Sequence, residues 1–155
     1  VFDKVLYNRN IDLKIGRDHL LLRERKIEEI MQKKYCRIIG NLSISEVINK
    51  MINAGYSESY LVDTKGKLIN KFELTKLLKE KNHNKKVLNL KKYRFLKILN
   101  EMDILSTIEC CKNFVGESVP IVDKNFKLMG VVSESNMFKI FLETSEMVHK
   151  IEAKD

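Results

Sequence analysis

The sequence predicts an α/β fold in which two βαββα repeats pack together with pseudo-two-fold symmetry. Residues 118–142 read as two short apolar strands, Val119–Val122 and Leu128–Val132, around a polar turn, with a helix opening at Ser133. A similar pattern stands sixty residues earlier. The chain has 155 residues, of which 44% are hydrophobic and 32% charged, as is typical of a soluble globular protein. That length suffices for one core, or for two small cores packed together.

The internal repeat extends through most of the chain. A shift of sixty positions places Ser59–Leu78 on Val119–Phe138 without a gap. The matched positions include Leu61, Val62 and Asp63 on Ile121, Val122 and Asp123, and, upstream, Ile44, Ile48, Met51 and Asn53 on Ile104, Ile108, Cys111 and Asn113. An internal repeat indicates that each copy is one structural unit that packs on its twin.

The first repeat is expected over residues 27–81. Its first long helix begins at Ser43, which forms a capping box with Glu46, and ends at Gly55. The other expected elements are a helical turn at Ile27–Met31, strands at Cys36–Ile39, Ser59–Val62 and Leu68–Lys71, and a helix near Glu73–Glu80.

The second repeat is expected over residues 95–155, after a connector at 1–26, the first repeat and a basic linker at 82–94. A strand at Phe95–Leu99 precedes a helix capped by Asp103, and the polar tail Glu143–Asp155 extends the last helix. Because the chain begins at Val1 and not at Met, we expect it to be part of a longer protein.

Five residues of the second repeat follow the pattern of a CBS domain, the cystathionine-β-synthase-type module. They are Pro120, Asp123, Gly130, Ser133 and Asn136. Together with the duplication, the chain resembles a tandem CBS pair, or Bateman module, over about residues 27–141. Such pairs commonly associate as homodimers, and Met51, Ile52, Met137, Ile140 and Phe141 are candidates for that contact or for the core within each repeat.

The connector resembles the segment that leads from the membrane into the CBS pair of ClC-type chloride channels and transporters. The matching positions are Leu6, Tyr7, Arg9, Ile11, Gly16, Arg17, Leu21–Leu22 and Ile27–Met31. The resemblance implies a cytoplasmic regulatory and dimerisation domain that modulates a chloride channel or H⁺/Cl⁻ antiporter in the plasma membrane. The alternatives are a CBS pair attached to another enzyme or transporter, and a stand-alone nucleotide sensor.

The CBS resemblance also implies a site for ATP, ADP or AMP, in which a Ser or Thr meets phosphate and an Asp holds the ribose. The corresponding candidates here are Gly130, Val131, Ser133 and Asn136. Asn136 has one acceptor oxygen in place of a carboxylate, which weakens the contact to the ribose. In the first repeat Glu73 and Lys76 take these places, so we expect no nucleotide there.

The segment between Lys76 and Arg94 is strongly basic. It holds eight Lys or Arg and one acid, Glu80, for a net charge of +7 in a chain of net charge +8. A solvated loop, an attraction to anionic lipid and nucleic-acid binding all fit this charge. Tyr93 is the single aromatic within the segment, which disfavours the stacking platforms that bind single strands.

The sequence gives no sign of catalysis. It shows no Ser–His–Asp order, phosphate loop or paired His motif, and its three histidines lack the spacing of metal ligands. Three cysteines, two of them adjacent, do not make a disulfide framework. We therefore expect a protein that is not an enzyme and holds no metal.

Overall fold

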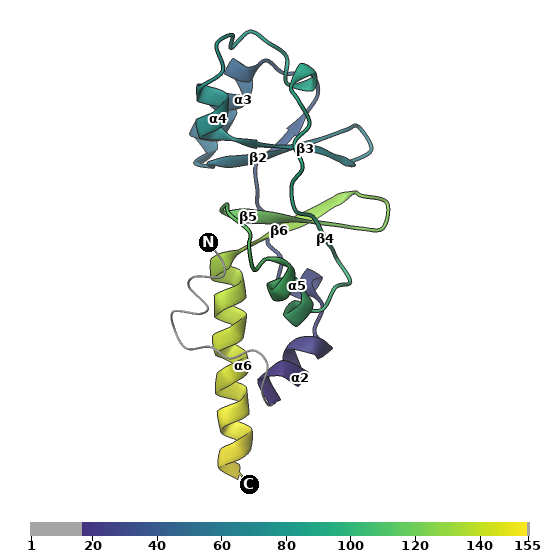
Figure 1. Cartoon of the computed structure of the whole chain (residues 1–155), viewed down its shortest axis with the longest axis vertical. Coiled ribbons are helices and arrows are strands. Elements are labelled where there is room, and N and C mark those ends of the chain that lie inside the picture. The colour runs from purple at the N-terminus through teal and green to yellow at the C-terminus, as the bar shows by residue number, and fades with distance from the viewer. Residues whose placement is uncertain (1–16, 155) are drawn as a thin grey trace.

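The first repeat forms a three-stranded sheet covered by two helices. The computed structural model describes residues 17–154 (Figure 1). The elements are β1 (Arg37–Ile39), α3 (Ile44–Ala54), β2 (Glu58–Val62), β3 (Leu68–Glu73) and α4 (Leu74–Leu78). Strand β2 lies in the centre of the sheet, parallel to β1 and antiparallel to β3.

The second repeat has the same order of elements. They are β4 (Ile98–Leu99), α5 (Ile104–Cys110), β5 (Ser118–Val122), β6 (Leu128–Ser133) and α6 (Glu134–Lys154). Strand β5 is central, and the register shifts at Ile121/Val122, sixty residues after the shift at Leu61/Val62. The predicted α/β duplication is therefore confirmed down to the irregularity in each sheet.

Local signals account for the helix boundaries. Ser43 Oγ accepts a hydrogen bond from the Glu46 amide at 3.2 Å, and Gly55 ends α3 with a left-handed φ of 77°. In α5, Asp103 Oδ1 accepts from the Ser106 amide at 2.8 Å. Helix α5 ends four positions earlier than α3 on the sixty-residue alignment, so residues 111–114 form a turn.

Two expected elements are shorter than predicted. Strand β4 covers two residues instead of Phe95–Leu99, because Phe95 and Leu96 lie half-buried beside a cleft and not in the sheet. Helix α4 covers five residues and not the expected Glu73–Glu80, since β3 runs on through Glu73.

The two repeats exchange their entry segments. The 3₁₀ turn η1 (Ile27–Glu29) opens the expected first repeat, yet Ile27 is fully buried in the core of the second. The matching turn η2 (Val87–Asn89) follows the first repeat, and Val87 is buried in that repeat's core. Ile27–Met31 thus comes first in the chain but packs with the second half.

The repeats meet through their hairpins, related by a pseudo-two-fold axis. The Leu68 amide donates to the Phe126 carbonyl at 2.9 Å, and the Leu128 amide donates to the Gly66 carbonyl at 3.0 Å. A shared apolar cluster lies between the two sheets and contains Tyr60, Val62, Leu68, Val122 and Val131. These contacts join the two three-stranded sheets without merging them into one.

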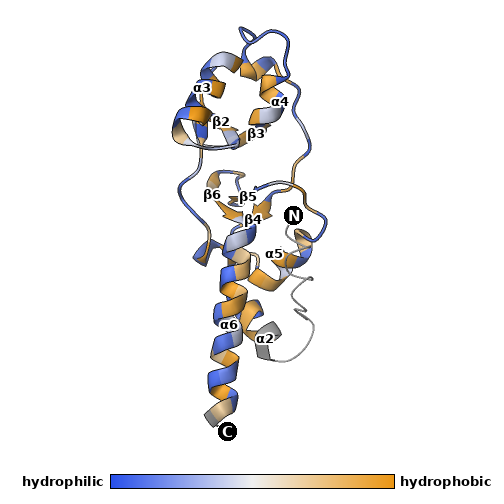
Figure 2. Ribbon diagram, turned by 90° about the vertical axis from the view of Figure 1, so that its left-hand side faces the viewer, coloured by the Kyte–Doolittle hydropathy of each residue, from blue (hydrophilic) through white to orange (hydrophobic). Residues whose placement is uncertain are grey.

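The second repeat carries two additional packing elements. Helix α2 (Arg17–Glu24) packs against α5 and α6, and Leu22 is fully buried in the core there. Figure 2 shows hydrophilic and hydrophobic residues mixed along the whole length of α6. No helix among residues 17–154 is long and apolar enough to cross a membrane.

Most of the candidate dimer residues lie inside the repeats. Met51, Met137, Ile140 and Phe141 are buried in the two cores, whereas Ile52 is 56% exposed on α3. The alternative that these side chains form the core therefore holds for four of them, and Ile52 stays a candidate for contact with a partner. The ClC-like connector positions up to Gly16 lie outside the described residues.

Candidate functional site

Two clefts open at the junction of the repeats, at positions related by the sixty-residue shift. The larger has a volume of about 480 Å³ and the smaller about 170 Å³. Side chains at matched positions line both, such as Arg94 and Phe95 in the larger cleft and Lys34 and Tyr35 in the smaller. The clefts are thus twins in backbone that differ in size and chemistry.

Two of the four residues predicted from the nucleotide pattern line the smaller cleft. Val131 and Ser133 line it, whereas Gly130 and Asn136 are not among its lining residues. Gly130 does permit a close approach, but the group that approaches is the protein's own backbone. A Cβ at Gly130 would lie 2.6 Å from the Gln32 carbonyl oxygen. Gln32 and Val131 exchange backbone hydrogen bonds at 2.7 and 2.9 Å.

Ser133 and Asn136 form hydrogen bonds mainly with each other. The Asn136 Oδ1 atom accepts from the Ser133 amide at 2.9 Å and from the Ser133 hydroxyl at 2.8 Å. The backbone amide of Asn136 donates to Ser133 Oγ at 3.2 Å. This is a capping box at the start of α6, so a ligand at these atoms would replace hydrogen bonds that already exist.

A buried ion pair separates the two clefts. Lys71 Nζ lies 3.1 Å from Glu58 Oε2, and both side chains are 7% exposed. Glu58 also accepts from the amide and the hydroxyl of Ser118, at 2.9 and 2.8 Å, while Lys71 donates to the Ser118 carbonyl at 2.8 Å. Two charged residues of the first repeat thus hold the start of β5 in the second, and their hydrogen bonds offset the desolvation of the charges.

Tyrosine side chains fill the space beside the smaller cleft. The Tyr60 hydroxyl bonds the Ser118 hydroxyl at 2.5 Å, and since Ser118 donates to Glu58, Tyr60 acts as the donor. Burial raises the pKa of Tyr60 far above its ordinary value, with the nearby Glu58 charge adding to the effect. Tyr35 packs edge-on against Tyr60 with ring centroids 6.1 Å apart. The neutral, hydrogen-bonded Tyr60 thus takes up part of the space on this side of the junction.

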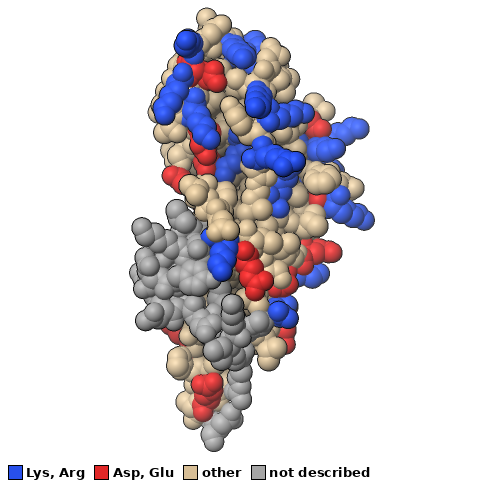
Figure 3. Space-filling view, viewed as in Figure 1, with Lys and Arg blue, Asp and Glu red and all other residues tan. Residues whose placement is uncertain are grey.

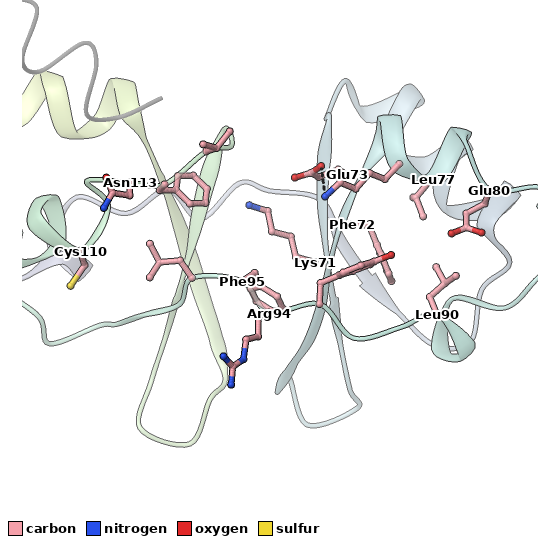
Figure 4. Close-up of a pocket in the computed structure, with 15 residues that line it drawn as sticks. Lys71, Phe72, Glu73, Leu77, Glu80, Leu90, Arg94, Phe95, Cys110 and Asn113 are labelled. Atoms are coloured by element: carbon pink, nitrogen blue, oxygen red, sulfur yellow. Dashed lines mark ion pairs between the residues drawn. The ribbon is translucent and has the colours of Figure 1, made fainter.

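The larger cleft combines aromatic rings with cations. Figure 4 shows Lys71 extending from β3 toward the second repeat. Its ammonium lies 5.0 Å from the Phe114 ring centroid, within the range of a cation–π interaction. At the rim, Lys76 lies 3.3 Å from Glu73 and 5.7 Å from the Tyr93 ring centroid. The full lining is Lys71, Phe72, Glu73, Lys76, Leu77, Glu80, Leu90, Tyr93, Arg94, Phe95, Leu96, Cys110, Asn113, Phe114 and Val115.

The size of this cleft follows from the shortened α5. The turn after Cys110 places Asn113, Phe114 and Val115 along the cleft wall, where the longer α3 still runs as helix at the matched positions up to Ala54. Apolar and aromatic walls with a few convergent polar groups are typical of small-molecule sites.

Glu58 and Lys71 were not singled out from the sequence. The repeat alignment holds a signal for them, because Glu58 matches Ser118 and Lys71 matches Val131. Opposite charges at two interior strand positions, where the twin has uncharged residues, indicate a buried pair specific to one repeat. Within residues 17–154 no group of His, Cys, Asp and Glu could hold a metal ion.

Comparison with known proteins rests on structure. No family model and no curated protein matches the sequence. A CBS domain pair/ACT domain protein from Thermotoga maritima matches with a TM-score of 0.66 at 17% identity, covering 76% of this chain and 97% of that one.

Two transporter domains match equally well. The cytosolic domain of the Mg²⁺ channel MgtE, in complex with ATP, gives a TM-score of 0.68 at 18% identity over 77% of this chain; the match spans half of that domain. The CBS domain of a bacterial CNNM/CorC family Mg²⁺ transporter gives 0.64 at 14% identity, over 79% of this chain and 78% of that one. The chain has the fold of a CBS domain pair.

Proposed function

We propose that this chain is the regulatory module of a membrane transporter and responds to a small effector held between its two repeats. The observation that carries the proposal is the larger cleft, whose walls come from both repeats. An effector that contacts both walls binds better to one relative arrangement of the repeats than to others, and a ligand shifts an equilibrium only by such a difference.

We propose a ClC-type chloride channel or H⁺/Cl⁻ antiporter as the parent, because the connector resembles the entry into the CBS pair of that family. Structural likeness to the MgtE and CNNM/CorC domains supports a second candidate, a transporter of another ion. Co-expression of the chain with either type of transporter core that lacks its own CBS pair, followed by ion-flux measurement, would discriminate between them.

We propose an adenine nucleotide as the effector and assign it to the larger cleft. Sites for small molecules usually enclose about 300–1,000 Å³, and the larger cleft falls within this range while the smaller does not. Phe95 and Phe114 offer ring surfaces for a base, and Arg94 offers positive charge for phosphate, whereas the charge of Lys71 is already paired with Glu58. This assignment reverses the sequence-based expectation, which favoured Ser133 and Asn136 and expected no nucleotide at Glu73 and Lys76, two residues that line the larger cleft.

The duplicated fold supplies a matched test of the assignment. Arg94 lines the larger cleft and Lys34, sixty residues earlier, lines the smaller; both are exposed. Calorimetric titration with ATP, ADP and AMP should show Arg94→Ala weakening binding about fivefold, for the loss of roughly 1 kcal/mol. Lys34→Ala should leave the affinity unchanged. The reverse result would move the effector to the smaller cleft, and no binding by the unmodified chain would exclude nucleotides.

Cysteine labelling gives a second readout. Cys110 lines the larger cleft and is exposed, whereas Cys36 and Cys111 are buried. Burial, with Cys110 next to it, raises the pKa of the Cys111 thiol to about 12, and burial also raises that of Cys36. Iodoacetamide should therefore alkylate Cys110 first, and bound nucleotide should slow that reaction.

A further inference from the structure

The charges of this protein are divided unequally between its two halves. Residues 33–97, which include the sheet and the two helices of the first repeat and the linker, hold sixteen Lys and Arg against five Asp and Glu, a net charge of +11. Residues 98–154 hold six against nine, a net charge of −3. Figure 3 shows Lys and Arg side chains spread over the upper repeat. The module is therefore strongly polarised along its long axis.

The densest positive charge lies on α4 and the linker. All eight basic residues of this segment are exposed, and we refer to them as the basic face: Lys76, Lys79, Lys81, Lys85, Lys86, Lys91, Lys92 and Arg94. The two ends of the segment meet, since Lys76 Nζ lies 5.7 Å from the Tyr93 ring centroid. Lys76 and Arg94 of the basic face therefore lie at the larger cleft, and the other six basic residues lie between them in the sequence, after α4.

The backbone under the basic face is held in place. The carbonyls of His83 and Lys85 accept from the first amides of α3, Ser45 and Ile44, both at 2.9 Å. The Val87 amide donates to the Leu42 carbonyl at 2.8 Å, and the Val87 side chain is buried. The lysines therefore project from an ordered support, which lowers the entropy lost when they bind a surface. The segment is still a largely irregular and exposed loop, as one of the sequence-based alternatives has it.

Large apolar side chains are exposed among these cations. Leu78 is 49% exposed, Leu88 48% and Tyr93 50%. Lysines that keep their charge in water around exposed aliphatic and aromatic groups are typical of surfaces that lie on a membrane. Nucleic acid fits less well, because the face has one Arg among eight cations and one aromatic ring within it, whereas recognition of nucleic acid favours Arg and stacked rings.

We propose that the basic face binds the surface of an anionic phospholipid bilayer, with Leu88 inserted between the headgroups. Each Lys or Arg near such a surface contributes about 1 kcal/mol. The negatively charged second repeat would then point away from the lipid. Although Lys76 and Arg94 belong to both surfaces, the inference can be tested apart from the effector proposed above, because Lys81, Lys85 and Lys86 do not line the larger cleft.

Co-sedimentation of the full chain with vesicles tests this. Binding is expected to vesicles containing phosphatidylserine and not to phosphatidylcholine alone. The variant Lys81→Gln/Lys85→Gln/Lys86→Gln should bind the anionic vesicles about a hundredfold more weakly. Raising the salt from about 0.1 M to 1 M, which shortens the Debye length from roughly 10 Å to 3 Å, should have a similar effect.

A matched control removes the same net charge from the other half. Lys124→Gln/Lys139→Gln/Lys150→Gln changes three exposed lysines of the second repeat and should leave binding nearly unchanged. Leu88→Ser should weaken binding severalfold at either salt concentration, since insertion is not screened. Circular dichroism would check that each variant keeps its fold. Equal losses in both triple variants, no binding to anionic vesicles by the unmodified chain, or displacement of the vesicles by an equal charge of RNA would each overturn the proposal.

Discussion

The two clefts are built on the same backbone plan, and one of them has nearly three times the volume of the other. At the smaller cleft, Tyr60, Tyr35 and Glu58 occupy part of the junction, and hydrogen bonds to Ser118 hold Tyr60 and Glu58 there. At the larger cleft, the helix ends early and a turn lines an open space. A few side chains and one lost helical turn thus convert a symmetric fold into an asymmetric pair of sites.

The two repeats also differ in their buried charges. The first repeat contributes both members of the buried pair Glu58–Lys71, while the second contributes Ser118, an uncharged partner with several hydrogen-bonding groups. The duplicated positions in the second repeat are Ser118 and Val131, so the pair has no twin. After a fold is duplicated, one repeat can acquire buried charged residues if the other repeat supplies hydrogen-bond partners for them.

The largest expected effect comes from breaking the buried pair. Lys71→Met leaves Glu58 buried without its cation and should lower the free energy of unfolding by about 3–5 kcal/mol. The double variant Glu58→Gln/Lys71→Met should recover much of this loss, because both charges are gone. Urea unfolding followed by circular dichroism measures both. A single-variant loss below about 1 kcal/mol would show that the pair is dispensable.

The strand position next to each cleft gives the second comparison. Gly130→Ala places a Cβ 2.6 Å from the Gln32 carbonyl and should destabilise the protein by about 1–3 kcal/mol through overpacking. Its twin, Asn70, already carries a side chain whose Nδ2 donates to the Lys91 carbonyl at 3.2 Å. Asn70→Ala should lose only about 1 kcal/mol. Thermal unfolding of the two variants, side by side, would show whether this order holds.

Phe95 and Tyr35 lie at matched positions, so replacing each in turn compares the two clefts as ligand sites. Phe95→Ala removes a ring from the larger cleft and should weaken adenine-nucleotide binding about tenfold, since stacking on one base contributes roughly 1–3 kcal/mol. Tyr35→Ala changes the matched position of the smaller cleft and should leave the affinity as it was. Fluorescence titration with a labelled nucleotide would report both, and equal effects would argue against a single occupied cleft.

Removing either helix cap should have the smallest effect on stability, and the two losses should be similar. Ser43→Ala and Asp103→Ala each remove a side chain that accepts from an amide of the first helical turn. Each change should lower the free energy of unfolding by about 1 kcal/mol. Chemical denaturation would measure this, and a near-zero loss at either site would mean that the exchanged entry segments alone fix the start of that helix.

The sequence was sufficient to predict the repeat and its local signals. Ser43 with Glu46, Gly55 and Asp103 lie where capping rules place them, because caps depend on residues a few positions apart. Local rules could not predict the exchange of η1 and η2. Ile27 belongs to the first repeat by its place in the chain, but it packs in the core of the second.

The site was predicted less completely than the fold. The nucleotide pattern led to Ser133 and Asn136, but their side chains form a cap and the space beside them is small. The volume of a cleft depends on where α5 ends and on how Tyr60 and Tyr35 pack, and neither follows from residue spacing alone. Which residues contact an effector remains a prediction.

The elements at both ends of the described residues pack on the second repeat. Helix α2, the turn η1 and the long helix α6 all pack with the second repeat. If the first repeat tilted against the second, the elements at both ends of the described residues would therefore keep their places on the second repeat, because their packing contacts lie there.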